Sequence, residues 1–159
     1  MSIRFLWTIL LTLGVAWFLT ILPMPTWAIG YRPQWAALTI VFWVTAFPDR
    51  VGVFWAFFAG LMLDVVTGSL LGLHALSFSI MGYLTVELQH RIALFLAWQQ
   101  ALSVWLILTV ERLVSLWVLS ATNQPTPGLS YWNATIVSML LWPWFAALLR
   151  ALVRRLDVT

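Results

Sequence analysis

The chain has 159 residues, of which 63% are hydrophobic and only 8% are charged, and its mean hydropathy is +0.97. A soluble domain carries about 25% charged residues, so this composition excludes a water-soluble domain and predicts an integral membrane protein. Cysteine is absent, which excludes disulfides, thiol nucleophiles and thiolate metal sites. All eight positive charges are arginines, and most of them lie at the ends of apolar segments. We therefore attribute the basic isoelectric point to anchoring at the cytoplasmic membrane edge and expect no nucleic-acid partner.

The first apolar segment is expected to be a membrane-spanning helix over residues 3–22. About 20 apolar residues are enough to cross a bilayer. A secretory signal peptide is the alternative, because Arg4 precedes the apolar run. The apolar core of a signal peptide is normally shorter and ends at a small-residue cleavage site, whereas this run ends in Pro23-Met24-Pro25. We therefore expect the segment to be retained as a helix.

Five further helices are predicted between loops that contain proline, glycine or several polar residues. The second and third are short, because the second covers 15 residues and would span about 22 Å of a hydrocarbon core about 30 Å thick. The last helix contains Pro143, which removes a backbone hydrogen bond to Met139 and is expected to bend the helix. The predicted helices form one all-α transmembrane domain over residues 1–159, and they cover residues 3–22, 33–47, 51–66, 70–86, 101–121 and 131–149.

The arginine distribution predicts that both termini are cytoplasmic. With an internal N-terminus, six arginines lie at the inner ends of the helices and only Arg32 lies in an outer loop, which is the positive-inside pattern. Five spans would place the three arginines of the C-terminal tail outside, so we reject five. The short helices at 33–47 and 51–66 can instead form a re-entrant hairpin, which leaves the sidedness of the termini unchanged. The inner arginines are Arg4, Arg50, Arg91, Arg150, Arg154 and Arg155.

Three glycines and one aspartate recur at every fourth position as Gly60, Asp64, Gly68 and Gly72. Residues four apart lie on one face of a helix, so Gly60 and Asp64 form a stripe with little side-chain bulk. Small residues and interhelical hydrogen bonds are what bring membrane helices together. The stripe is therefore expected to pack against another helix, either of this chain or of a partner.

Asp64 is a charge inside a membrane segment, which is a hypothesis of function by default. Its possible functional roles are proton relay, cation or substrate ligand, and catalytic acid. Its possible structural roles are a cap on the backbone N–H groups of the turn at 67–69 or of the next helix, and an ion pair with an arginine such as Arg112. We favour a structural role, because catalytic carboxylates usually occur in partnered sets.

Glu111 and Arg112 lie near the middle of the predicted fifth helix. Adjacent helical residues point about 100° apart, so these two cannot form a good ion pair with each other and each needs a separate partner. We favour buried pairing within the chain, since charges inside the membrane normally pair. Contact with a second copy or with a partner's helix is the alternative, and transport or catalysis is a third.

Neither a metal site nor a catalytic set can be assembled from the sequence. His74 and His90 are the only histidines and show no H-x-x-x-H or H-E-x-x-H spacing. Ser69 lacks the G-x-S-x-G context of a nucleophile, and His74 is the only base available within a helix. The glycines match no nucleotide-binding fingerprint, so we expect no metal, no cofactor and no enzymatic activity.

Five short motifs, in their order and spacing, resemble those of the rod shape-determining protein MreD family in its proteobacterial form. The resemblance covers about residues 31–150, which is most of the chain. The motifs are Arg32-Pro33-Gln34-Trp35, Phe47-Pro48-Asp49-Arg50-Val51, Gly60-x-x-x-Asp64-x-x-x-Gly68-x-x-x-Gly72, Ala97-Trp98-Gln99-Gln100-Ala101 and Leu141-Trp142-Pro143-Trp144.

The resemblance implies a non-catalytic, multi-pass protein of the bacterial inner membrane that belongs to the machinery for cell elongation. It implies binding to MreC, a single-span periplasmic protein, and indirect links to the filament protein MreB, the RodA glycosyltransferase and a class B penicillin-binding protein. It also implies a fold similar to the six-helix S-components of energy-coupling-factor vitamin transporters. The most recognisable family positions fall on Gly60, Asp64, Gly68 and Gly72.

Two functions from different classes follow. The first is a membrane scaffold for lateral wall synthesis, in which the helix of MreC lies beside the third and fourth helices and a homodimer is possible. The second is a binding subunit for a small molecule or a lipid-linked precursor, which the many tryptophans and Glu111 suggest.

Overall fold

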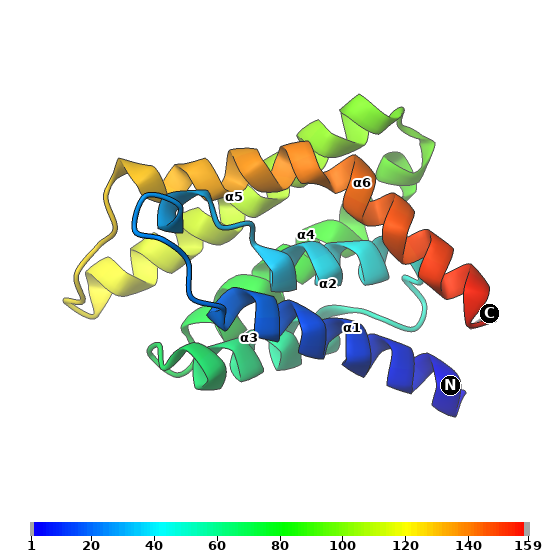
Figure 1. Cartoon of the computed structure of the whole chain (residues 1–159), viewed down its shortest axis with the longest axis horizontal. Coiled ribbons are helices and arrows are strands. Elements are labelled where there is room, and N and C mark those ends of the chain that lie inside the picture. Colours follow the sequence, from blue (N-terminus) through cyan, green and yellow to red (C-terminus); the bar gives the residue numbers. More distant parts are fainter. Residues whose placement is uncertain (1, 158–159) are drawn as a thin grey trace.

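The computed structural model describes residues 2–157 and contains helices and no strand in that range. The helices form one bundle in which both described ends of the chain lie at the same end (Figure 1). The connections from α1 to α2, α3 to α4 and α5 to α6 lie at the opposite end (Figure 1). The α-helices are α1 (Ile3–Ile21), α2 (Trp35–Ala46), α3 (Val53–Thr67), α4 (Leu73–Leu94), α5 (Ala97–Ala121) and α6 (Asn133–Arg155), and the short 3-10 helices are η1 (Ile29–Tyr31) and η2 (Leu129–Trp132).

The helix α2 forms the centre of the bundle. Its residues from Ala36 to Val44 are all buried, and α2 packs against α1, α3, α4 and α6. A helix that is apolar on every side is one that other helices surround. Trp43 is fully buried, and its indole N–H donates a 2.9 Å hydrogen bond to the hydroxyl of Thr12 in α1, which fixes α2 against α1.

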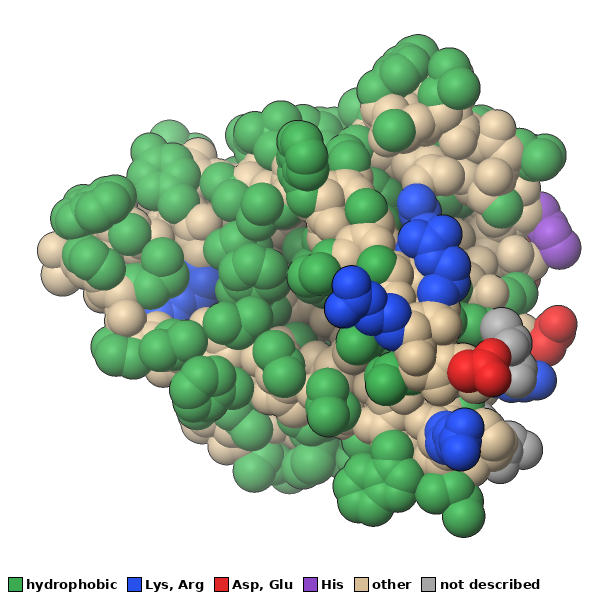
Figure 2. Space-filling model, turned by 45° about the vertical axis from the view of Figure 1, so that its right-hand side comes forward, with side chains coloured by type: hydrophobic (Ala, Val, Ile, Leu, Met, Phe, Trp, Pro, Cys, Tyr) green, Lys and Arg blue, Asp and Glu red, His purple; other side chains and the backbone are tan. Residues whose placement is uncertain are grey.

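The outer surface is largely apolar. Large side chains such as Trp7 of α1, Phe54 of α3 and Trp117 of α5 are each more than two-thirds exposed, and hydrophobic side chains cover much of the face in Figure 2. Three segments are long and apolar enough to cross a membrane, namely α1, α5 and residues 129–155. An apolar exterior of this extent is suited to contact with lipid, as the composition predicted.

Three helices extend beyond their predicted ends. The polar connection expected after residue 86 is helical instead, because α4 continues to Leu94. Similarly, α5 begins at Ala97 and α6 continues to Arg155. Arginines lie in the last turns of α4 and α6, where a positive charge interacts favourably with the helix dipole. Hydropathy underestimated these helices because the missed turns are polar, namely the last turns of α4 and α6 and the first turn of α5.

The helices α2 and α3 are shorter than predicted. The predicted helix at 33–47 begins only at Trp35, so Pro33 precedes its first turn, and it is 12 residues long. The helix predicted at 51–66 begins at Val53 and has 15 residues. The helix α6 contains Pro143 and changes direction along its length (Figure 1).

Candidate functional site

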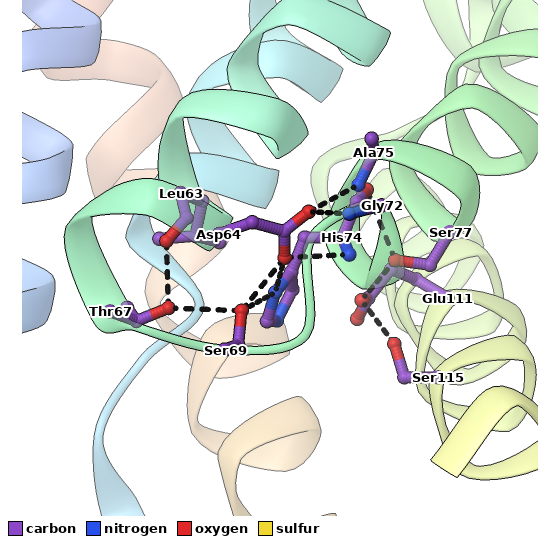
Figure 3. Close-up of polar contacts among 10 residues, drawn as sticks. All are labelled: Leu63, Asp64, Thr67, Ser69, Gly72, His74, Ala75, Ser77, Glu111 and Ser115. Carbon is purple, nitrogen blue, oxygen red and sulfur yellow. Dashed lines mark hydrogen bonds and ion pairs between the residues drawn. The ribbon is translucent and has the colours of Figure 1, made fainter. Parts of the chain in front are cut away.

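Asp64 lies in the last turn of α3 and is 1% exposed. Its carboxylate accepts five hydrogen bonds from the segment that follows α3 (Figure 3). One oxygen, Oδ1, accepts from the Ser69 hydroxyl at 2.8 Å and from the His74 backbone N–H at 3.0 Å. The other, Oδ2, accepts from the backbone N–H groups of Gly72 at 3.0 Å and Ala75 at 3.3 Å. A buried charge is tolerated here because every lone pair has a donor.

The backbone around Asp64 explains this arrangement. The first N–H groups of a helix lack intrahelical partners and are normally capped by a side chain at the residue before the helix. That residue is Gly72, which has no side chain and a φ of 97°. Asp64 supplies the missing cap from the preceding helix. The chain turns back through Gly68, whose φ of 67° is in the left-handed region that favours glycine.

Gly60 lies one turn before Asp64, where the backbones of α3 and α4 approach closely. A Cβ atom at Gly60 would lie 2.6 Å from the carbonyl carbon of His74 and 2.8 Å from the nitrogen of Ala75. Any side chain there would therefore force the two backbones apart. The stripe of Gly60 and Asp64 packs against α4 of the same chain, which is one of the two alternatives left open above.

His74 is the ionisable partner of Asp64. Its ring nitrogen Nδ1 lies 2.8 Å from Oδ1, and the His74 side chain is 24% exposed while that of Asp64 is fully buried. Because a carboxylate only accepts hydrogen bonds, Nδ1 must be the donor. The ion pair between Asp64 and Arg112 that the sequence left open is not formed.

Ser69, His74 and Asp64 are the residue types of a catalytic triad, but their arrangement differs from one. In a triad, the carboxylate binds one ring nitrogen and the serine binds the other. Here, the Ser69 hydroxyl lies 3.4 Å from Nδ1, the same nitrogen that contacts Asp64, and it donates to Asp64 at 2.8 Å. These three residues therefore hold the turn between α3 and α4 and lack the geometry that activates a serine.

Glu111 forms a second buried polar cluster, on α5, and is 2% exposed. Its Oε1 accepts hydrogen bonds from Ser77 of α4 and Ser115 of α5, each at 3.0 Å (Figure 3). Its Oε2 accepts from the Gln34 amide before α2, at 2.7 Å. One carboxylate therefore connects α4, α5 and the start of α2.

Arg112 and Glu111 contact different partners. Its Nε lies 3.9 Å from Oε2 of Glu111, which is too long for a hydrogen bond. The guanidinium carbon lies instead 3.9 Å from the ring centroid of Tyr131 in η2, a cation–π contact. The expectation that these two adjacent residues have separate principal partners agrees with this geometry.

A cavity of about 580 Å³ lies between the two polar clusters and the loops of the same end. It is lined by the connection from α1 to α2, by η2, by the last turns of α3, by the first turns of α4 and by the middle of α5. His74, Glu111 and Arg112 all line it, as do Arg32 and Gln34. No group of three or more metal-ligating side chains is found among residues 2–157.

The structure thus brings four of the predicted residues together at one junction and two at another. Gly60, Asp64, Gly68 and Gly72 surround the turn between α3 and α4, whereas Glu111 and Arg112 lie on α5 beside Ser77 and η2. Sequence reasoning offered Asp64 as a cap on the next helix, but it missed the side-chain partners of Asp64 and all the partners of Glu111. Ser69 and His74 follow Asp64 by only five and ten positions. Their closeness in the sequence is the signal that could have identified them as hydrogen-bond donors to Asp64. The partners of Glu111 are Gln34, Ser77 and Ser115, and that of Arg112 is Tyr131.

Comparison with known proteins gives the family. The model of a family described as rod shape-determining protein MreD matches residues 1–152. A curated relative from Haemophilus influenzae, also named rod shape-determining protein MreD, is 31% identical over 166 residues, and the alignment covers 99% of each chain. This chain belongs to the MreD family. The resemblance found in the motifs is thereby confirmed, and MreD membership gives the chain a role in determining rod shape.

No solved structure matches the chain. Two of the five motifs that resemble the MreD family can now be assigned to contacts in the fold. The glycine and aspartate motif forms the junction of α3 and α4, and the motif at 32–35 supplies Gln34 to Glu111.

Proposed function

We propose that this chain is a non-enzymatic scaffold in the bacterial inner membrane. It binds MreC and helps to couple MreB, RodA and a class B penicillin-binding protein so that the cell keeps its rod shape. The observation that carries the proposal, beyond family membership, is that both buried carboxylates accept hydrogen bonds that join helices. Asp64 joins α3 to α4, and Glu111 joins α5 to α4 and α2. Groups held in this way fix the positions of the helices that they join.

The proposed topology has six membrane crossings with both termini in the cytoplasm, in an arrangement similar to the S-components of energy-coupling-factor transporters. Two observations support it. Both described ends of the chain lie at one end of the bundle (Figure 1). Charged side chains gather toward that end in Figure 2, while hydrophobic side chains cover most of the remaining surface. An anionic inner leaflet attracts such a basic end.

The helix of MreC would lie beside α3 and α4. Both helices have large apolar side chains on their outer faces, and such faces are where a second membrane helix can pack. Asp64 would act indirectly, by fixing the angle and distance between α3 and α4. The exposed apolar side chains are Phe54, Phe57, Val65 and Val66 on α3 and Leu76 and Tyr83 on α4.

Co-purification with MreC tests this proposal. We expect Asp64→Leu to reduce the amount of MreC recovered per folded molecule, because leucine cannot cap α4 and the junction opens. Asp49→Leu is the matched control, since Asp49 is an exposed carboxylate in the turn before α3. Undiminished recovery of MreC with folded Asp64→Leu protein would count against a binding site beside α3 and α4.

A further inference from the structure

The cavity near Arg112 has the size of a ligand site. Its volume of about 580 Å³ is within the range of roughly 300–1,000 Å³ that is usual for small-molecule pockets. Aromatic side chains of Trp27, Trp35 and Tyr131 form part of its wall. The scaffold function proposed above does not use this space.

Two of the residues that line the cavity each have a buried polar atom without a hydrogen-bond partner among residues 2–157. These atoms are Nε of Arg112, a donor, and Oε1 of Gln34, an acceptor. Leaving such groups unpaired is unfavourable, because they have lost their hydrogen bonds to water and gained none in the protein. The orientation of Gln34 is fixed, because its NH₂ group must face the Glu111 carboxylate, to which it donates at 2.7 Å. Its carbonyl oxygen is therefore left as a free acceptor.

The charges that line the cavity favour an anion. Two arginines and one glutamate line it, so positive side chains outnumber negative ones in the wall itself, and Asp64 lies behind His74 as its hydrogen-bond partner. Glu111 already accepts three hydrogen bonds from neutral donors. The Arg32 guanidinium is also engaged, because it donates to the backbone carbonyls of Thr20 and Leu22 at the end of α1.

Arg112 is consequently the cation that remains for a ligand. Its guanidinium carbon lies 3.9 Å from the ring centroid of Tyr131, which holds the group in position without consuming its hydrogen-bond donors. A planar guanidinium is well matched to the oxygens of a phosphate. The free carbonyl of Gln34 requires a donor on the same ligand, and a hydroxyl group near the phosphate would supply it.

We propose that this cavity binds the phosphate ester of a polyol, with Arg112 contacting the phosphate and Gln34 accepting a hydrogen bond from a hydroxyl. The proposal goes beyond the scaffold function and does not depend on it. It also gives a chemical class to the small-molecule alternative of the sequence analysis. Such a ligand can come from water, as glycerol phosphate, or from the membrane, as the headgroup of phosphatidylglycerol.

Chemical labelling of the unmodified protein distinguishes these sources. The full chain is placed in phosphatidylcholine nanodiscs and treated with phenylglyoxal, which modifies arginine, and labelling of each arginine is followed by mass spectrometry of peptides. Either glycerol 3-phosphate is added or part of the lipid is replaced by phosphatidylglycerol. We expect one of these additions to slow labelling of Arg112 about tenfold when the ligand is at about ten times its dissociation constant. Arg155, which is exposed on α6, is the control and should be slowed much less.

The outcomes decide the proposal. Protection of Arg112 by glycerol 3-phosphate supports a soluble ligand, and protection by phosphatidylglycerol alone supports a lipid headgroup. The proposal is overturned by no protection from either, by equal slowing at Arg155, or by an Arg112 that phenylglyoxal never modifies in neutral discs. Native mass spectrometry supplies a second readout, in which Arg112→Gln loses a retained ligand that Arg155→Gln keeps.

Discussion

The ring nitrogen Nδ1 of His74 lies 2.8 Å from Oδ1 of Asp64, and this contact joins the last turn of α3 to the first turn of α4. The same carboxylate accepts hydrogen bonds from the backbone N–H groups of Gly72, His74 and Ala75. An aspartate that stands alone in an apolar stretch of sequence is thus the cap of the following helix.

Replacing Asp64 tests the strength of this cap. We expect Asp64→Leu to lower the free energy of unfolding by about 2 kcal/mol or more, because several buried donors lose their acceptor. Asp64→Asn keeps one carbonyl oxygen and should cost less. The measurement is thermal unfolding in detergent, followed by tryptophan fluorescence. Asp49→Asn changes an exposed carboxylate and should stay within about 0.5 kcal/mol of the native chain.

Gly60 and Gly14 form a matched pair for testing the approach of α3 to α4. In Gly60→Ala, the new methyl group would overlap the backbone at His74, and we expect a loss of roughly 1–3 kcal/mol from forced repacking. Gly14 is also inside a helix, but a Cβ there meets nothing within 4 Å. Gly14→Ala should therefore stabilise the chain by up to about 1 kcal/mol through helix propensity. Equal effects of the two substitutions on the unfolding temperature would contradict the close packing at Gly60.

Glu111 is expected to hold three helical segments together. Glu111→Leu removes the acceptor for Gln34, Ser77 and Ser115, and we expect it to lower stability by about 2 kcal/mol or more. Glu87 is exposed on α4, so Glu87→Leu provides the control. The same unfolding measurement applies, and a control as damaging as Glu111→Leu would show that loss of an acidic group, rather than of these contacts, is responsible.

The absence of cysteine makes the topology directly measurable. With a single cysteine introduced at Asn123, in the loop after α5, a membrane-impermeant maleimide should label intact spheroplasts from outside. With a single cysteine at Arg155, near the end of α6, labelling should require permeabilised membranes. Labelling of both positions from the same side would contradict an odd number of crossings between them.

Sequence reasoning was most successful where the relevant contacts are local. The spacing of Gly60, Asp64, Gly68 and Gly72 indicated a close helix approach and a cap on the next helix, and all four lie within one turn and its two flanking helices. A helix cap depends on residues only a few positions away, so the spacing of residues along the chain is enough to predict it.

Contacts between segments that are far apart in the chain could not be predicted from the sequence. Gln34 and Glu111 are 77 positions apart and Ser77 and Glu111 are 34 apart, and hydropathy assigns residues to faces without stating which faces meet. The end of α4 was missed for another reason. Its last two turns contain Glu87 and Arg91, and a polar helix end has the same composition as a loop.

The central claim is that Asp64 and Glu111 position helices and carry out no reaction. The most direct test replaces the native protein in rod-shaped cells with Asp64→Asn or Glu111→Gln and compares cell shape with the amount of folded protein in the membrane. We predict that each variant supports rod shape in proportion to its folded amount, so that raising expression to the native level restores the rods. A variant that is folded at the native level and still yields round cells would contradict the claim.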